Sequence, residues 1–204
     1  MAAWDSFMPD VLVHATSAPD PFVRQALRRA ARELCQRTYV WRAWIACVKS
    51  VSPVSEYTFT LPTDSEIVRF EKVTLDGVPV EVLDFKAGTR DPVTHAADDP
   101  LGAASNGLVT FTLSGGEVTG TVKAFVSLMP TPLAPTCPNL LLRYLECIAH
   151  GAAASLCATP GASFENRDES QRLRSMFEDE IGAAGNDVFR GHRAAQPRAA
   201  ISWF

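Results

Sequence analysis

The sequence lacks the short motifs that mark common catalytic and nucleotide-binding sites. It contains no GxSxG, no GxxxxGK(S/T) phosphate loop, no GxGxxG and no HExxH. Metal-ligand spacing is also missing from its four histidines, which are His14, His95, His150 and His192. The acidic run 178–180 would point consecutive carboxylates to different faces of a helix, so it is not a paired acid and base. We therefore expect a protein that is not an enzyme and that holds no metal or cofactor.

Paired cysteines and a secretion signal are missing as well. No CxxC pair occurs among the five cysteines, which are Cys35, Cys47, Cys137, Cys147 and Cys157. We interpret them as small buried hydrophobic residues in a reducing cytosol. The first residues lack a basic region followed by an apolar run, so we expect no signal peptide. Charged side chains interrupt the longest apolar stretch, 140–157, and we expect no membrane span.

What the sequence does contain is the composition of a soluble globular protein. Of its 204 residues, 47% are hydrophobic and 21% are charged, which is enough apolar material for a core. The length fits one ordinary domain or a domain with a sizeable insertion. The formal net charge is −4, whereas proteins that grip DNA concentrate lysine and arginine on their surface. We therefore do not expect the whole surface to bind DNA.

After a short lead over 1–19, a first helix is predicted at about 21–38. Asp20 suits its cap, and Pro21 suits its first position. Its apolar stripe consists of Val23, Leu27, Ala30, Leu34 and Trp41. Its other faces bear a run of arginines at Arg24, Arg28, Arg29 and Arg32. Such a run is typical of a solvated face, and contact with an acidic neighbour is the alternative.

Between residues 44 and 128 an apolar period of two predicts strands. These strands cover 44–49, 57–61, 67–75, 78–82, 108–113 and 118–128. Asp76-Gly77 predicts a type I′ hairpin turn, and Gly115-Gly116 predicts a second hairpin. Pro79 cannot donate to a hydrogen-bond ladder, so its strand is predicted at an edge. The polar, turn-rich segment 84–107 is predicted to be a long loop.

Two further helices are predicted after the extended, proline-rich segment 129–138. The first, 139–157, is apolar around most of its circumference, which indicates burial either at the centre of the subunit or against a neighbour. The second begins near Asn166, which forms a pattern similar to a capping box with Glu169. The apolar stripe of this last helix is Leu173, Phe177, Ile181 and Ala184.

The order of these elements indicates an α+β protein. We expect a helical bundle (1–43 and 130–189) with an inserted antiparallel β domain (44–129) and an extended C-terminal tail (190–204). The tail combines basic and large apolar residues, among them Arg190, Arg193, Arg198, Ile201, Trp203 and Phe204. Its terminal aromatic pair packs either on the chain's own core or on a partner, and we favour the partner.

Several segments, in this order, resemble head-to-tail adaptor (connector) proteins of tailed bacteriophages, a class that includes the tail tubular A type of short-tailed phages. The resembling segments are PDPFVRQALRRAARELCQRT (19–38) with Trp41, YTFTLP (57–62), RFEKVTLDGVPV (69–80), the helix around 140–154 and the C-terminal end. The resemblance implies a dodecameric ring under the portal that extends the DNA channel. It also implies that the tail, here 190–204, reaches up to the portal and docks there.

If the resemblance holds, the partners are other copies of the chain, the portal protein and a downstream tail or neck protein. Double-stranded DNA would pass through the lumen without specific binding, in a virion protein made in the host cytoplasm. A head-to-tail ring contact needs two different faces per subunit. The candidates are Arg24, Arg28 and Arg32 on the first helix, and Glu178, Asp179 and Glu180 on the last.

Three alternatives stay open at this point. The first is another neck component, such as a head-completion or tail-terminator protein. The second is a monomeric binding module that recruits a partner through the β insertion and the 84–107 loop. The third is an enzyme with an unrecognised site, for example one that uses His95 with Asp98.

Overall fold

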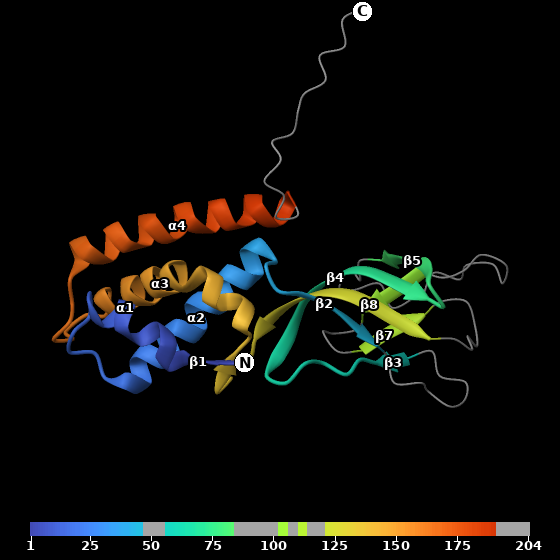
Figure 1. Cartoon of the computed structure of the whole chain (residues 1–204), viewed down its shortest axis with the longest axis horizontal. Coiled ribbons are helices and arrows are strands. Elements are labelled where there is room, and N and C mark those ends of the chain that lie inside the picture. Colours follow the sequence, from blue (N-terminus) through green and yellow to red (C-terminus); the bar gives the residue numbers. More distant parts are fainter. Residues whose placement is uncertain (47–55, 84–101, 106–109, 114–120, 191–204) are drawn as a thin grey trace, which may run out of the picture.

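The helices lie at one end of the molecule and the larger of its two sheets lies at the other (Figure 1). This computed structural model describes residues 1–46, 56–83, 102–105, 110–113 and 121–190. The helical segments are η1 (Trp4–Phe7), α1 (Met8–Leu12), α2 (Asp20–Thr38), η2 (Asn139–Tyr144), α3 (Leu145–Cys157) and α4 (Arg167–Phe189). The strands are β1 (Ala2–Ala3), β2 (Arg42–Ala46), β3 (Glu56–Thr58), β4 (Ser65–Leu75), β5 (Val78–Leu83), β6 (Gly102–Ser105), β7 (Thr110–Leu113), β8 (Val122–Pro130) and β9 (Thr136–Cys137). This mixture of helices and sheet agrees with the predicted α+β class.

The first long helix, α2, has the predicted apolar face. Its buried residues include Val23, Leu27, Ala30 and Leu34. The helix begins at Asp20, and Pro19 occupies the cap without a side-chain hydrogen bond, so the predicted Asp20 cap is wrong. The helix ends where Tyr39 adopts the left-handed conformation (φ 54°) and donates its backbone N–H to the Cys35 carbonyl.

The central element of the helical part is α3, which contacts α1, α2 and α4. Nine of its 13 residues are buried within the chain. Its apolar character therefore comes from a central position and does not require a second subunit. The segment Asn139–Cys157 has the length and composition to span a membrane, but this burial accounts for its apolar composition. The predicted α-helix is wrong over 139–144, which form the 3-10 helix η2.

The packing of α4 against α3 depends on one residue without a side chain. A Cβ atom on Gly151 would lie 2.8–2.9 Å from ring carbons of Phe177, which is fully buried. At the start of α4, the Asn166 side chain accepts a hydrogen bond from the Glu169 backbone N–H (3.1 Å), which confirms the predicted cap. The predicted stripe is confirmed as buried and consists of Leu173, Phe177, Ile181 and Ala184.

The lead over 1–19 supplies part of the core, which the sequence analysis missed. Trp4 and Phe7 are 2% and 0% exposed, and the Trp4 Nε1 donates to the Ala134 carbonyl at 2.8 Å. Strand β1 also pairs with β9 in a small antiparallel sheet. A signal was present, because the apolar residues at positions 4, 7, 8 and 11 have helical spacing.

The larger sheet has seven strands in the order β2-β8-β4-β5-β6-β7-β3. The predicted Asp76-Gly77 hairpin joins β4 to β5, with both turn residues at positive φ. The second predicted hairpin is wrong, because β7 pairs with β3 and β6 whereas β8 pairs with β2 and β4. Its Gly115-Gly116 turn lies outside the described residues. The insertion is also not purely antiparallel, since β5 and β6 run parallel.

Strand β5 lies between β4 and β6, so the predicted edge position is wrong for the strand as a whole. Its residues 78–80 pair with β4, and its residues 81–83 pair with β6. Pro79 therefore has a ladder neighbour on one side only, which is where proline is tolerated. The predicted loop 84–107 contains β6, and the rest of that segment lies outside the described residues.

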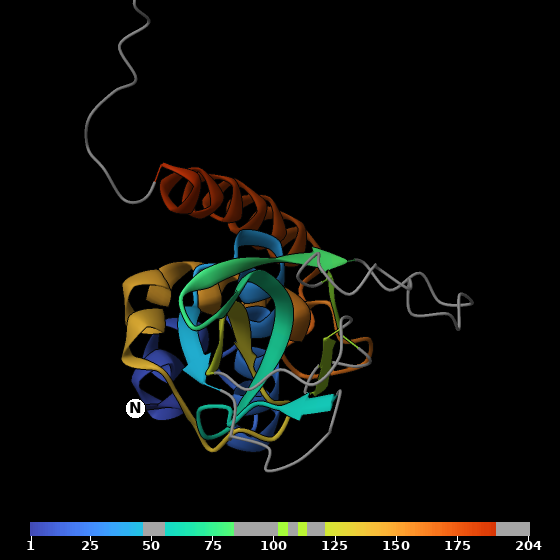
Figure 2. The same ribbon diagram turned by 90° about the vertical axis from the view of Figure 1, so that its right-hand side faces the viewer.

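A single cluster of buried side chains continues from the helices into the sheet. Strand β8 connects the two parts, since its residues 126–130 are buried and it contacts α2 as well as β2 and β4. Seen from the sheet end, the strands stand in front of the helices and α4 lies above them (Figure 2). Strands β2 and β8 extend slightly across the predicted limits at 43/44 and 129/130. The division into bundle, insertion and tail stays a prediction.

Gly151→Ala should lower stability, and Gly182→Ala is its matched control on α4. A Cβ at position 151 would overlap the fully buried ring of Phe177, whereas a Cβ at position 182 would meet no atom within 4 Å. Both changes gain the same helix propensity, so we expect Gly151→Ala to be less stable than Gly182→Ala by about 1–3 kcal/mol. Urea unfolding of both variants measures this difference. Equal stabilities would contradict the close packing of α3 and α4.

Candidate interaction surfaces

The predicted interface arginines of α2 all have partners within the chain. Arg24 forms an ion pair with Asp5 (2.9 Å), and Arg28 Nε donates to the Ala134 carbonyl (2.9 Å). Arg32 donates to Glu66 (3.0 Å) and to a backbone carbonyl of β8. These contacts connect α2 to the N-terminal lead, the turn after β8 and the sheet. A role in subunit contact stays a prediction for all three.

The predicted acidic residues of α4 do not form one patch. Glu178 bonds to Arg37 of α2 (2.6 Å) and to Arg174 (2.7 Å), and Glu180 lies 3.1 Å from Nδ1 of His150 on α3. Asp179 is exposed. Two of the three carboxylates therefore connect α4 to the helices beneath it, and only Asp179 points to solvent. Their intersubunit role also stays a prediction.

Further ion pairs connect α4 to α2 and to the turn that follows α1. Arg174 contacts Glu33 of α2 (2.5 Å), and a hydrogen bond from Arg37 lowers the pKa of Glu178. Near the start of α4, Glu169 binds Nδ1 of His14 (2.9 Å). A hydrogen bond from Arg172, assisted by His14, lowers the pKa of Glu169 to about 2. These contacts are partly exposed, so each stabilises the fold only modestly.

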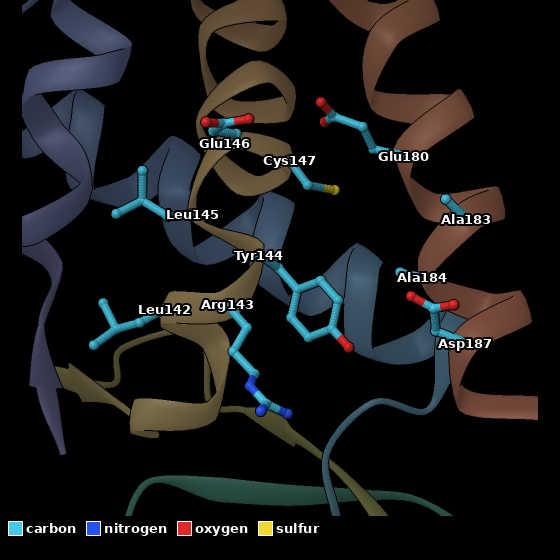
Figure 3. Close-up of a pocket in the computed structure, with 10 residues that line it drawn as sticks. All are labelled: Leu142, Arg143, Tyr144, Leu145, Glu146, Cys147, Glu180, Ala183, Ala184 and Asp187. Atoms are coloured by element: carbon cyan, nitrogen blue, oxygen red, sulfur yellow. The ribbon is translucent and has the colours of Figure 1, made fainter. Parts of the chain in front are cut away.

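A groove of about 600 Å³ lies between η2, the start of α3 and the last turns of α4. We call it the acidic groove, because Glu146, Glu180 and Asp187 line it against a single cation, Arg143. Its apolar lining includes Leu142 and Ala184. The Tyr144 side chain points across the groove toward Asp187 (Figure 3), and burial, with help from Asp187, raises the pKa of Tyr144.

A second pocket, of about 450 Å³, lies along residues 21–32 of α2 beside the turn after β8. We call it the arginine patch, because it is lined by Arg28, Arg29 and Arg32 together with Gln25, Pro21, Pro132 and Leu133. Leu133 is 83% exposed, and the neighbouring Phe22 is 56% exposed. The patch therefore combines positive charge with exposed apolar surface, as partner-binding surfaces often do.

Sequence reasoning found the arginines of the patch but missed the acidic groove. Tyr144 and Glu146 belong to η2 and the first turn of α3. Asp187 belongs to the last turn of α4, more than 40 positions later in the sequence. No local pattern brings them together, because only the packing of α4 along α3 does so.

Of the predicted tail, Arg190 lies at the exposed end of α4. Arg193, Arg198, Ile201, Trp203 and Phe204 lie outside the described residues.

The described cysteines have the character expected of small buried residues. Cys35, Cys137, Cys147 and Cys157 are buried, whereas Cys47 lies outside the described residues. Burial raises the pKa of the Cys35 thiol to about 12 and that of Cys137 to about 11. Such thiols are poor nucleophiles and poor metal ligands. In the described ranges, no three His, Cys, Asp or Glu side chains are grouped closely enough to hold a metal ion.

Comparison with known protein families gives a match. A family model described as SU10 adaptor protein matches residues 5–200, which includes the helices, the sheet and most of the segment after α4. No curated protein matches the chain.

The pKa of Glu169 leads to a prediction about acid stability. This pKa lies near 2 in the folded chain and has an ordinary value of 4.5, so the ionised carboxylate stabilises the fold above about pH 4.5. That contribution is lost as the pH falls from about 4.5 toward 2. Glu169→Gln should therefore be less stable than the wild type at pH 7, with a difference that shrinks to nothing near pH 2. Urea unfolding at a series of pH values tests this.

Asp168→Asn is the matched control, since Asp168 is an exposed neighbour in the same first turn. It should show a smaller pH-dependent difference than Glu169→Gln. A Glu169→Gln difference that stays constant from pH 7 to pH 2 would contradict the assigned pKa.

Proposed function

The chain belongs to the SU10 adaptor protein family, and we propose that its subunits form a ring that joins the capsid portal to the tail or neck and extends the DNA channel. The family is one of phage structural adaptors and not of enzymes, and its members are virion components of the head-tail junction. The single observation that supports the proposal most is the extent of the match. Residues 5–200 include every described α-helix and nearly all strands, so the likeness is not confined to one module.

The ring itself is the finer part of the proposal, with a dodecamer as the expected size. Burial of α3 does not support it, because nine of its 13 residues are already buried within one chain. Support comes from the two pockets, which lie on different elements and have opposite charge. A head-to-tail contact that closes into a ring needs two different faces per subunit. The predicted role of Arg24, Arg28, Arg32 and the acidic residues 178–180 in the subunit contact is part of this proposal.

The remaining partners follow from the proposed position. The portal lies above the ring and a downstream tail or neck protein lies below it, and double-stranded DNA passes through the lumen without specific binding. The net charge of −4 is consistent with passage, because tight phosphate binding needs a concentrated basic surface. We propose synthesis in the host cytoplasm before assembly. Another neck role, as a head-completion or tail-terminator protein, is the second candidate because it uses the same junction.

Cryo-electron microscopy of virions tests the position directly. We expect density for this chain as a ring between the portal and the tail, with its helices and sheet arranged as in Figure 1. A ring found instead at the far end of the neck would favour the tail-terminator role. A particle without the chain would reject the structural proposal, and a monomeric binding module would replace it.

Deletion of residues 196–204 tests the proposed docking of the C-terminal segment on the portal. The deletion removes Arg198, Ile201, Trp203 and Phe204 and leaves all described residues in place. We expect a folded subunit, with unchanged circular dichroism and melting temperature, that no longer binds purified portal. A truncated chain that fails to fold would show that the segment belongs to the subunit's own core. A truncated chain that binds portal normally would also reject the docking role.

A further inference from the structure

The charges that remain available on the surface differ from those that the sequence suggests. Among the described residues, no ion pair or hydrogen bond engages the side chains of Arg29, Glu146 and Asp187, and all three are exposed. By contrast, Arg28 and Arg32 in the same patch, and Glu180 in the same groove, already have partners in the chain. The patch therefore offers Arg29, and the groove offers two carboxylates against one exposed cation, Arg143.

The acidic groove has the chemistry of a site for a cationic side chain with an apolar stem. Tyr144, Leu142 and Ala184 provide apolar surface, and the carboxylates of Glu146 and Asp187 lie beside it. An arginine suits such a site, because its methylene stem packs on apolar walls while its planar guanidinium bonds to carboxylates.

The arginine patch has the complementary features. Arg29 extends from α2 beside Leu133, which is 83% exposed, so a cation and an apolar side chain stand together on one surface. The groove offers carboxylates next to Leu142, which is 39% exposed, in the same combination. Charge and apolar surface therefore match on both sides, which favours a specific orientation of the partner and faster association.

The two surfaces share no residue and lie on different parts of the helical end. The groove is formed by η2, α3 and the C-terminal turns of α4, whereas the patch is formed by residues 21–32 of α2 and the turn after β8. The ion pair from α2 to Glu178 of α4 comes from Arg37, which lies beyond the patch. One subunit can therefore use both surfaces at once with two different neighbours, as a head-to-tail assembly requires.

We propose that the arginine patch of one copy docks into the acidic groove of the next copy, with Arg29 entering between Tyr144, Glu146 and Asp187. This inference rests on the proposed ring and names the surfaces that build it. It replaces the exposed outer face of α4, where Asp179 lies, as the acidic half of the contact. Because the contact combines charge with apolar burial, raising the salt concentration weakens it without abolishing it.

Charge reversal in the full-length chain tests the pairing. Arg29→Glu and Asp187→Arg each place like charges in contact, so each variant alone should assemble at a concentration on the order of tenfold or more above the wild type. Mixed in equal amounts, the two variants restore opposite charges at every contact of an alternating ring, and assembly should return. Mass photometry over a concentration series measures the result, and the melting temperature of each variant confirms that it is folded.

Asp179→Arg is the matched control, because it makes the same reversal on the exposed face of the same helix. It should assemble like the wild type. The pairing is rejected if wild-type rings tolerate both single reversals, if the mixture fails to restore assembly, or if Asp179→Arg alone prevents it. Wild-type subunits that stay monomeric, both free and on the portal, would reject the ring itself and the pairing with it. The two failures are thus distinguishable.

Discussion

The burial of α3 on several sides is the constraint on which the rest of the structure depends. A helix this apolar is stable in water only when other elements cover it, and here α1, α2 and α4 do so. The fourth helix can approach closely only because residue 151 has no side chain and leaves room for the ring of Phe177. The path of α4 along α3 in turn sets where the acidic groove forms and where the C-terminal segment begins.

Features determined by neighbouring residues could be predicted from the sequence. The Asp76-Gly77 turn and the Asn166 cap depend on local backbone chemistry, and the stripes of α2 and α4 depend on helical spacing. Features determined by distant pairing could not. The position of β8 between β2 and β4, and the parallel pairing of β5 with β6, depend on contacts that no local pattern specifies. The same limit hid the acidic groove, whose two sides come from separate helices.

The arginines show why charge patterns alone are weak guides to interfaces. A run along one helix suggested a single basic face, yet three of its four members hold the N-terminal lead, the turn after β8 and the sheet against α2. Such contacts arise wherever a long flexible cation lies near a free carbonyl or carboxylate of its own chain. Only a structure separates charges that serve the fold from those that remain for a partner, and here that separation leaves Arg29.

The four buried thiols have a consequence for a particle that leaves the cell. Inside the host the cytosol is reducing, but a released virion stays in oxygenated water for long periods. Oxidation proceeds through the thiolate, and burial raises the pKa of Cys35, Cys137 and Cys147, which favours the protonated thiol. The four described cysteines are free thiols, and none of them readily forms a disulfide by exchange with other proteins. Burial of these thiols thereby protects the described part of the subunit against oxidation outside the host.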